Sequence, residues 1–280
     1  LAACAAYWGG VGENDSFRYI EGALGWLQNG PQIGDTHWTL RTPLIAPMAA
    51  SFALFGPSEF SAALPNVVYA GLLVFLTYFM ARRYWGETTA IWVALTTAVS
   101  AFLVGMQIEL SATGVELFFA AMACWLFVDG TRARPTRLVL AGLFAGGAWL
   151  CRETNVFLPL TFFAVLAMQR PLPVRAIVCA LAPFGAVIAA EMLFYTLSVG
   201  DPFYRYLTDL GHRGEAGVYA DLSSRGPAFI EWLIRPIFYL FSDPAATPAF
   251  LLGAFAIAHR KVRCLDGPEL VCLLVDDQHV

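Results

Sequence analysis

Apolar runs of near-membrane length recur along the chain. One of the clearest covers residues 65–81, PNVVYAGLLVFLTYFMA, and Arg82 and Arg83 follow it at once. Only 14% of the 280 residues are Asp, Glu, Lys or Arg, whereas about 25% is usual in soluble domains. So few charges could not cover a surface that faces water. The sequence therefore predicts an all-α protein, built as a polytopic bundle of transmembrane helices.

Arginine clusters between the apolar runs predict which side of the membrane each turn occupies. The candidate spans are 65–81, 88–106, 111–128, 138–150, 155–168, 176–199 and 247–258. Cytoplasmic turns carry an excess of Arg and Lys. The clusters expected in the cytoplasm are Arg82 with Arg83, Arg132 with Arg134 and Arg137, Arg170 with Arg175, and Arg260 with Lys261 and Arg263.

Alternation of the spans then assigns the remaining connections to the outside. They are residues 9–61, 105–110, 151–155 and 200–242, provided that 229–241 lies at the interface instead of crossing. The transmembrane domain is expected over residues 1–263, with a short tail at 264–280. The opening LAACAAYW is too short to span and is interpreted as the end of a helix, and the final segment CLDGPELVCLLVDDQHV has only a short apolar patch. Both ends of the chain are therefore expected to be incomplete.

The first outside segment concentrates charge in a chain that otherwise avoids it. Residues 15–28 predict an amphipathic helix, because Phe17, Ile20, Leu24 and Leu27 recur at helical spacing. The following Asn-Gly-Pro is a helix stop. A second, mostly apolar helix is predicted over 42–55, which ends at a Gly-Pro pair.

Several short motifs in this order resemble the GT-C membrane glycosyltransferases. They are Asp15-Ser-Phe-Arg18-Tyr19-Ile-Glu21, Arg41-Thr42-Pro43-Leu44, FGPSEF at 55–60, AGGAWLCR at 145–152 and GDPFY at 200–204. The closest likeness is to the phospholipid carrier-dependent branch with protein O-mannosyltransferases and the aminoarabinose transferases of lipid A. Many relatives have a second acid where Ser16 stands, and the aminoarabinose branch has a lysine at Thr42.

The resemblance implies a reaction and a location. A sugar would pass from a polyprenyl-phosphate donor lipid to a protein, lipid or glycan acceptor at the extracytoplasmic face of the plasma (bacterial inner) membrane. The sequence does not identify the sugar or the acceptor. A net charge of −4 argues against a nucleic-acid partner. The alternative is a multi-span transporter or lipid flippase that uses Glu116 and Glu191 as coupling acids.

Two carboxylates are candidate catalytic residues. An acceptor hydroxyl needs a base as it attacks the sugar C1, and we expect Asp15, at the start of the family motif, to serve. Asp is also favoured at the start of a helix, and the two roles can coexist. Glu116 lies in the apolar run GVELFFAAMACW, where a carboxylate is costly unless it has a polar partner or cavity.

Half of the expected substrate-binding residues are arginines, because a guanidinium meets phosphate oxygens in two places. They are Arg18, Tyr19, Glu21, Arg41, Glu109 and Arg152. Arg41 is the first choice for the lipid phosphate. The alternative role of Arg18 is an intrahelical ion pair with Asp15, which lies one helical turn away, and the alternative role of Arg152 is interfacial snorkelling. The other outside candidates are Arg205, Arg213 and Arg225; Glu191 is expected to be a buried, paired acid.

The sequence predicts no metal site. His37 near Asp35, and His212 near Asp209, match no ligand signature. Some relatives use a divalent cation, so the cofactor stays unknown. The six cysteines form no CxxC pair and are expected to be small apolar core residues.

Overall fold

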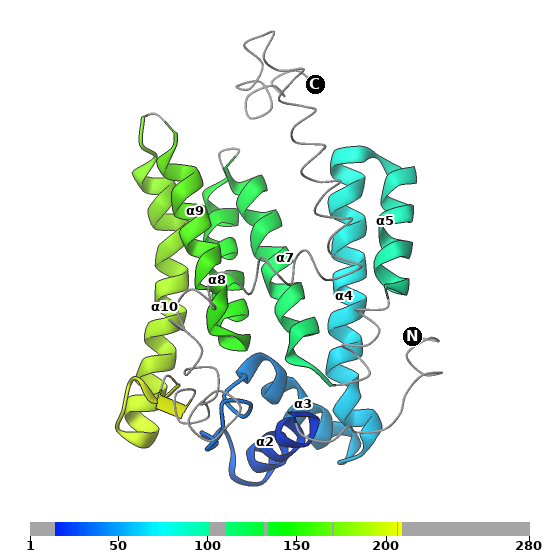
Figure 1. Cartoon of the computed structure of the whole chain (residues 1–280), viewed down its shortest axis with the longest axis vertical. Coiled ribbons are helices and arrows are strands. Elements are labelled where there is room, and N and C mark those ends of the chain that lie inside the picture. Colours follow the sequence, from blue (N-terminus) through cyan, green and yellow to red (C-terminus); the bar gives the residue numbers. More distant parts are fainter. Residues whose placement is uncertain (1–14, 101–109, 132–133, 170, 206, 209–280) are drawn as a thin grey trace, which may run out of the picture. The chain divides into compact units, whose positions relative to one another are not determined.

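The described part of the chain is helical. The computed structural model describes residues 15–100, 110–131, 134–169, 171–205 and 207–208, all within a compact unit over Leu1–His212. Its helices are α2 Asp15–Asn29, α3 Thr42–Phe55, α4 Glu59–Trp85, α5 Glu87–Val99, α7 Ala112–Gly130, α8 Pro135–Cys151, η1 Glu153–Val156, α9 Phe157–Ala167 and α10 Val174–Val199 (Figure 1). No strand occurs among these residues, so the predicted all-α class is confirmed.

Within the described ranges, three helices are long and apolar enough to cross a membrane: α4, α7 and α10. The predicted spans at 138–150 and 155–168 form α8 and α9, which are shorter apolar helices. The start of the predicted span 88–106 forms α5. The rest of that run, the expected interfacial stretch 229–241 and the last span at 247–258 lie outside the described residues.

The two helices predicted in the first outside segment both form. α2 covers 15–29 against the predicted 15–28, and α3 has the predicted bounds. α2 buries Tyr19 and Ala23 in a core cluster with Leu44, Ile45 and Met48 of α3. Ile20 and Leu24 pack at the edge of this cluster. Phe17 and Leu27, which belong to the same predicted apolar set, are instead exposed.

Small residues bring α8 close to both of its neighbours. Gly142 and Gly146 are spaced by four residues, so they share one face of α8, and this face meets Pro183 and Val187 of α10. Gly147 points to Phe119 of α7 instead. The three helices lie side by side in Figure 1. This close packing sets how far the polar groups at the helix ends stand from one another.

A buried carboxylate joins three helices at the end of the bundle away from α2 and α3. Asp129, near the end of α7, is only 2% exposed. It pairs with Arg83 at the end of α4, at 2.6 Å, and with Arg137 in the first turn of α8. Two of the arginine clusters found in the sequence are thus drawn together around one acid.

Candidate active site

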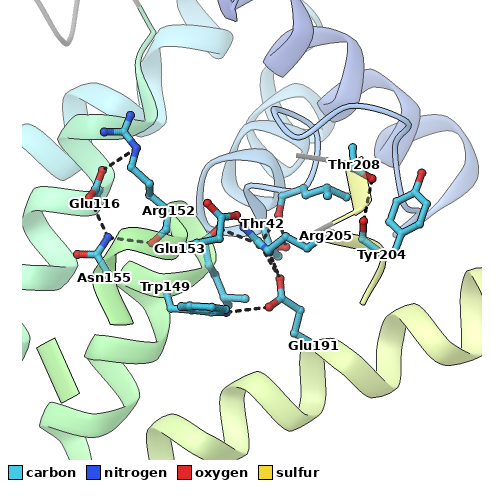
Figure 2. A network of polar contacts seen from close by, with 12 residues as sticks. Thr42, Glu116, Trp149, Arg152, Glu153, Asn155, Glu191, Tyr204, Arg205 and Thr208 are labelled. Carbon is cyan, nitrogen blue, oxygen red and sulfur yellow. Dashed lines mark hydrogen bonds and ion pairs between the residues drawn. The ribbon is translucent and has the colours of Figure 1, made fainter. Parts of the chain in front are cut away.

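Charged residues from distant segments meet near the place where α3 packs on α7 and α8, and Figure 2 shows part of this network. They form three groups, which centre on Arg41, Glu116 and Arg205.

Arg41 contacts Tyr19 of α2. Arg41 is the residue before α3, which begins with Thr42-Pro43, and proline in the first turn is a favourable helix start. Its Nη1 donates a hydrogen bond to the Tyr19 hydroxyl, and its guanidinium carbon lies 5.5 Å from the ring centre. The distance suits a cation–π contact. Arg41 is therefore fixed by both the hydroxyl and the ring of Tyr19.

The electrostatics of Tyr19 show what surrounds it. Burial raises the pKa of its phenol to about 12, Arg41 and Arg152 oppose that rise, and Asp15 adds to it. The phenol therefore stays protonated at neutral pH. Asp15, one helical turn before Tyr19, is exposed. The base candidate and both leading phosphate candidates thus act on one side chain.

Glu116 of α7 is held by two residues that follow α8. Asn155 Nδ2 donates to its carboxylate at 2.8 Å, and Arg152 Nε lies 3.6 Å away (Figure 2). Asn155 also donates to the carbonyl oxygens of Ala148 and Arg152, at 3.1 Å each, which fixes the turn. The Glu116 side chain is 16% exposed and that of Arg152 is 41% exposed. Arg152 is thus tethered through Nε while much of its side chain remains open.

Arg205 lies between two carboxylates. Its Nε donates to Glu191 of α10 at 2.7 Å, and its Nη1 donates to Glu153 of η1 at 2.6 Å (Figure 2). Trp149 Nε1 and the Tyr195 hydroxyl also donate to Glu191, at 2.9 Å each. Burial pushes the pKa of Glu153 up, but Arg205 more than offsets this and leaves that pKa below its usual range. Glu191 is the buried, paired acid that the sequence predicted.

The other predicted site residues are placed differently. Arg18 and Glu21 form an exposed ion pair with each other on α2, at 3.0 Å. Arg18 thus makes an intrahelical ion pair, but its partner is Glu21 and not Asp15, the partner considered from the sequence. Among the described residues, neither Arg18 nor Glu21 forms a hydrogen bond or ion pair with Arg41 or Arg152. Glu109 lies outside the described residues.

Sequence reasoning assigned no site role to Asn155, Glu153 or Trp149. Each sits beside a residue that the motifs had singled out, yet none has a distinctive sequence signal. The clearest available signal was Glu191, an isolated acid in a long apolar run, which required a buried partner. Which cation supplied that partner depended on how the chain folds after α10.

The arrangement suits the handling of an anionic ligand at the end of the bundle. Arg41 and Arg152 are partly exposed, and exposed Asp15 lies on the adjoining helix. Within the described ranges, no group of three His, Cys, Asp or Glu residues could hold a metal ion. The polar contacts here are made by arginine, carboxylate, amide and phenol groups.

A comparison with protein families identifies one match. The model of the dolichyl-phosphate-mannose-protein mannosyltransferase family matches residues 42–195, which is more than half of the chain. Searches of curated proteins and of solved structures found no match. The matched range includes Glu116 and Arg152, whereas Asp15, Arg41 and Arg205 lie outside it.

The match agrees with the helical membrane bundle and with the family resemblance found in the sequence. The chain belongs to the dolichyl-phosphate-mannose-protein mannosyltransferase family and is a membrane glycosyltransferase of the GT-C type.

Proposed function

We propose that this protein transfers a sugar from a polyprenyl-phosphate donor to a hydroxyl of a protein, lipid or glycan acceptor, with Asp15 as the base. The observation that carries the proposal is the contact between Arg41 and Tyr19 of α2, because Asp15 lies one helical turn before Tyr19 on the same helix. A base and a phosphate ligand are needed on neighbouring segments, because the attacked sugar carbon is bonded to the phosphate oxygen.

The proposed reaction is a single displacement at the sugar C1. The acceptor oxygen forms a bond to C1 as the bond from C1 to the phosphate oxygen breaks, and Asp15 takes the acceptor's proton. The leaving lipid phosphate gains a negative charge. Arg41 and Arg152 stabilise that charge, and their effect is greater in the transition state than in the bound donor.

Tyr19 and Glu116 have supporting roles in this scheme. Tyr19 holds the guanidinium of Arg41 through its hydroxyl and ring. Glu116 holds Arg152 through Nε and leaves the terminal nitrogens to face the ligand. Glu116 stays the second candidate for the base. Its contacts with Asn155 and Arg152 favour a holding role over proton transfer.

The reaction is proposed on the extracytoplasmic side of the plasma membrane, in bacteria the inner membrane. The support is the positive-inside rule. Arg83 and Arg137 gather around Asp129 at the end of the bundle away from α2 and α3. If that end faces the cytoplasm, the end of the bundle beside α2 and α3 faces the extracytoplasmic side.

The decisive experiment compares Asp15→Asn with wild type in membranes that contain a labelled polyprenyl-phosphate sugar. We expect transfer to fall by about a hundredfold or more, because general-base catalysis contributes about 10²–10⁴-fold. Asp35→Asn is the matched control, since Asp35 is also an exposed acid of the first segment. Full transfer by Asp15→Asn would remove Asp15 as the base, and a loss in Glu116→Gln alone would assign that role to Glu116.

A further inference from the structure

The guanidinium of Arg205 is enclosed by the protein on all of its nitrogens. Its side chain is 4% exposed. Nε donates to Glu191 and Nη1 to Glu153, while Nη2 lies 2.5 Å from the Glu191 carboxylate and also donates to the carbonyl oxygens of Leu40 at 3.2 Å and Leu150 at 3.3 Å. Few of its donors remain for any ligand.

Its charge is also already neutralised. Burial lowers the pKa of Arg205, but the carboxylates of Glu191 and Glu153 and the phenol of Tyr195 more than offset this and raise it above its usual range. Two carboxylates face one guanidinium, so the group as a whole repels an anion. Arg205, which the sequence offered as one of the phosphate candidates, is therefore unsuited to bind phosphate directly.

The backbone that Arg205 holds belongs to the two arginines that are suited to that task. Leu40 immediately precedes Arg41. Leu150 and Glu153 stand on either side of Arg152. Arg205 itself follows α10. Its rigid, planar guanidinium thus connects the start of α3 to the turn after α8.

Glu191 keeps the guanidinium of Arg205 in one orientation. Its carboxylate accepts from Trp149 of α8 and from Tyr195, one helical turn further along α10. These two hydrogen bonds hold the Glu191 carboxylate in place independently of Arg205. The network is therefore anchored to two helices that pack tightly through Gly142 and Gly146.

We propose that Arg205 is a positioning residue that sets the spacing of Arg41 and Arg152 around a single lipid phosphate. The inference rests on the proposed function, since it takes these two arginines as the phosphate ligands. Arg205 does not touch the ligand and acts only through the two backbone segments.

The test uses Arg205→Lys in the purified full chain and measures the binding of a polyprenyl monophosphate. Lysine keeps the positive charge between Glu191 and Glu153, but its compact ammonium cannot also reach both carbonyl oxygens. We expect affinity to fall by at least about tenfold, because misplaced binding groups lose much of their effect. The KM for the acceptor should stay unchanged.

Arg137→Lys is the matched control. It also replaces an arginine that pairs with a buried carboxylate, but at the far end of the bundle. It is expected to lower the melting temperature without weakening the binding of the monophosphate. An equal loss of affinity in both variants would attribute the effect to general loosening of the fold and overturn the positioning role.

A double substitution separates positioning from direct contact. If Arg205 acts through its neighbours, Arg205→Lys should change affinity by no more than about twofold once Arg41 and Arg152 are both Gln, because coupled residues are not additive. Losses that multiply in full would show direct contact and contradict the inference, as would wild-type affinity in Arg205→Lys.

The same assay distinguishes failure of the positioning role of Arg205 from failure of the proposed sugar transfer. A wild-type chain that neither binds the monophosphate nor transfers sugar would remove both proposals. A wild-type chain that does both, combined with unchanged binding and transfer in Arg205→Lys, would remove the positioning role alone.

Discussion

At the scale of single residues, Tyr19 controls how Arg41 is presented. The phenol is buried, and burial raises its pKa to about 12 from an ordinary value of 10.0. A folded-state pKa above the unfolded value means that the protonated phenol stabilises the fold below about pH 10. That contribution, about 2–3 kcal/mol for a shift of this size, is lost as the pH rises through the folded-state pKa.

Tyr19→Phe tests this directly by thermal unfolding at a series of pH values. At neutral pH the variant should unfold at a lower temperature, because Arg41 loses an acceptor worth about 1–3 kcal/mol. The two melting curves should converge between pH 10 and 12, since only wild type has a phenol at this position to ionise. A constant difference across that range would contradict the raised pKa.

At the scale of elements, the glycines of α8 determine how closely the neighbouring helices pack. Gly142 has no room for a side chain, because an added Cβ would overlap the carbonyl oxygen of Ala180 and lie 3.2 Å from the Pro183 Cβ. A backbone atom cannot turn aside as a side chain can. By contrast, a Cβ added to Gly185 on α10 would have no neighbour within 4 Å.

Gly142→Ala should therefore force α8 and α10 apart. We expect a loss of about 1–3 kcal/mol in unfolding free energy, the usual cost of overpacking, together with weaker sugar transfer because Trp149 and Glu191 would separate. Gly185→Ala should be neutral or slightly stabilising, since alanine favours helix. Unfolding in detergent and a transfer assay would check both. Equal stability of the two variants would contradict the close approach.

At the scale of the whole molecule, the two ends of the bundle differ in charge chemistry. One end gathers arginines around Asp129, and the other holds carboxylates and arginines beside α2 and α3. A membrane protein orients so that turns with an excess of Arg and Lys stay in the cytoplasm. This asymmetry predicts opposite exposure of the two ends in intact cells.

Labelling with a membrane-impermeant thiol reagent tests the orientation. Asp35→Cys lies in the exposed connection between α2 and α3, and Thr136→Cys lies in the exposed first turn of α8. In intact cells we expect labelling of Asp35→Cys above the wild-type background and none of Thr136→Cys. Permeabilised cells should label both. The reverse pattern would place the candidate site in the cytoplasm.

Local patterns in the sequence were enough to predict the helices. Low charge and long apolar runs indicated a helical membrane bundle, and helical spacing with Gly-Pro stops gave α2 and α3 nearly to the residue. These signals are reliable because they depend on neighbours within a turn or two. The spans were less accurate, since α8 and α9 are shorter than a full crossing and their ends depend on packing.

The partners of the charged residues could not be read in this way. The motifs singled out Asp15, Arg41 and Arg152, and its place in an apolar run singled out Glu116. Hydropathy and spacing gave no basis for pairing Glu116 with Arg152 or for enclosing Arg205. Arg205 and Leu40 are 165 residues apart in the chain. The sequence by itself determined that this protein is a helical membrane bundle with a charged first segment. Only the tertiary structure decided which charges meet, because close approach of α8 to α7 and α10 fixes the distances over which a guanidinium can reach its acceptors.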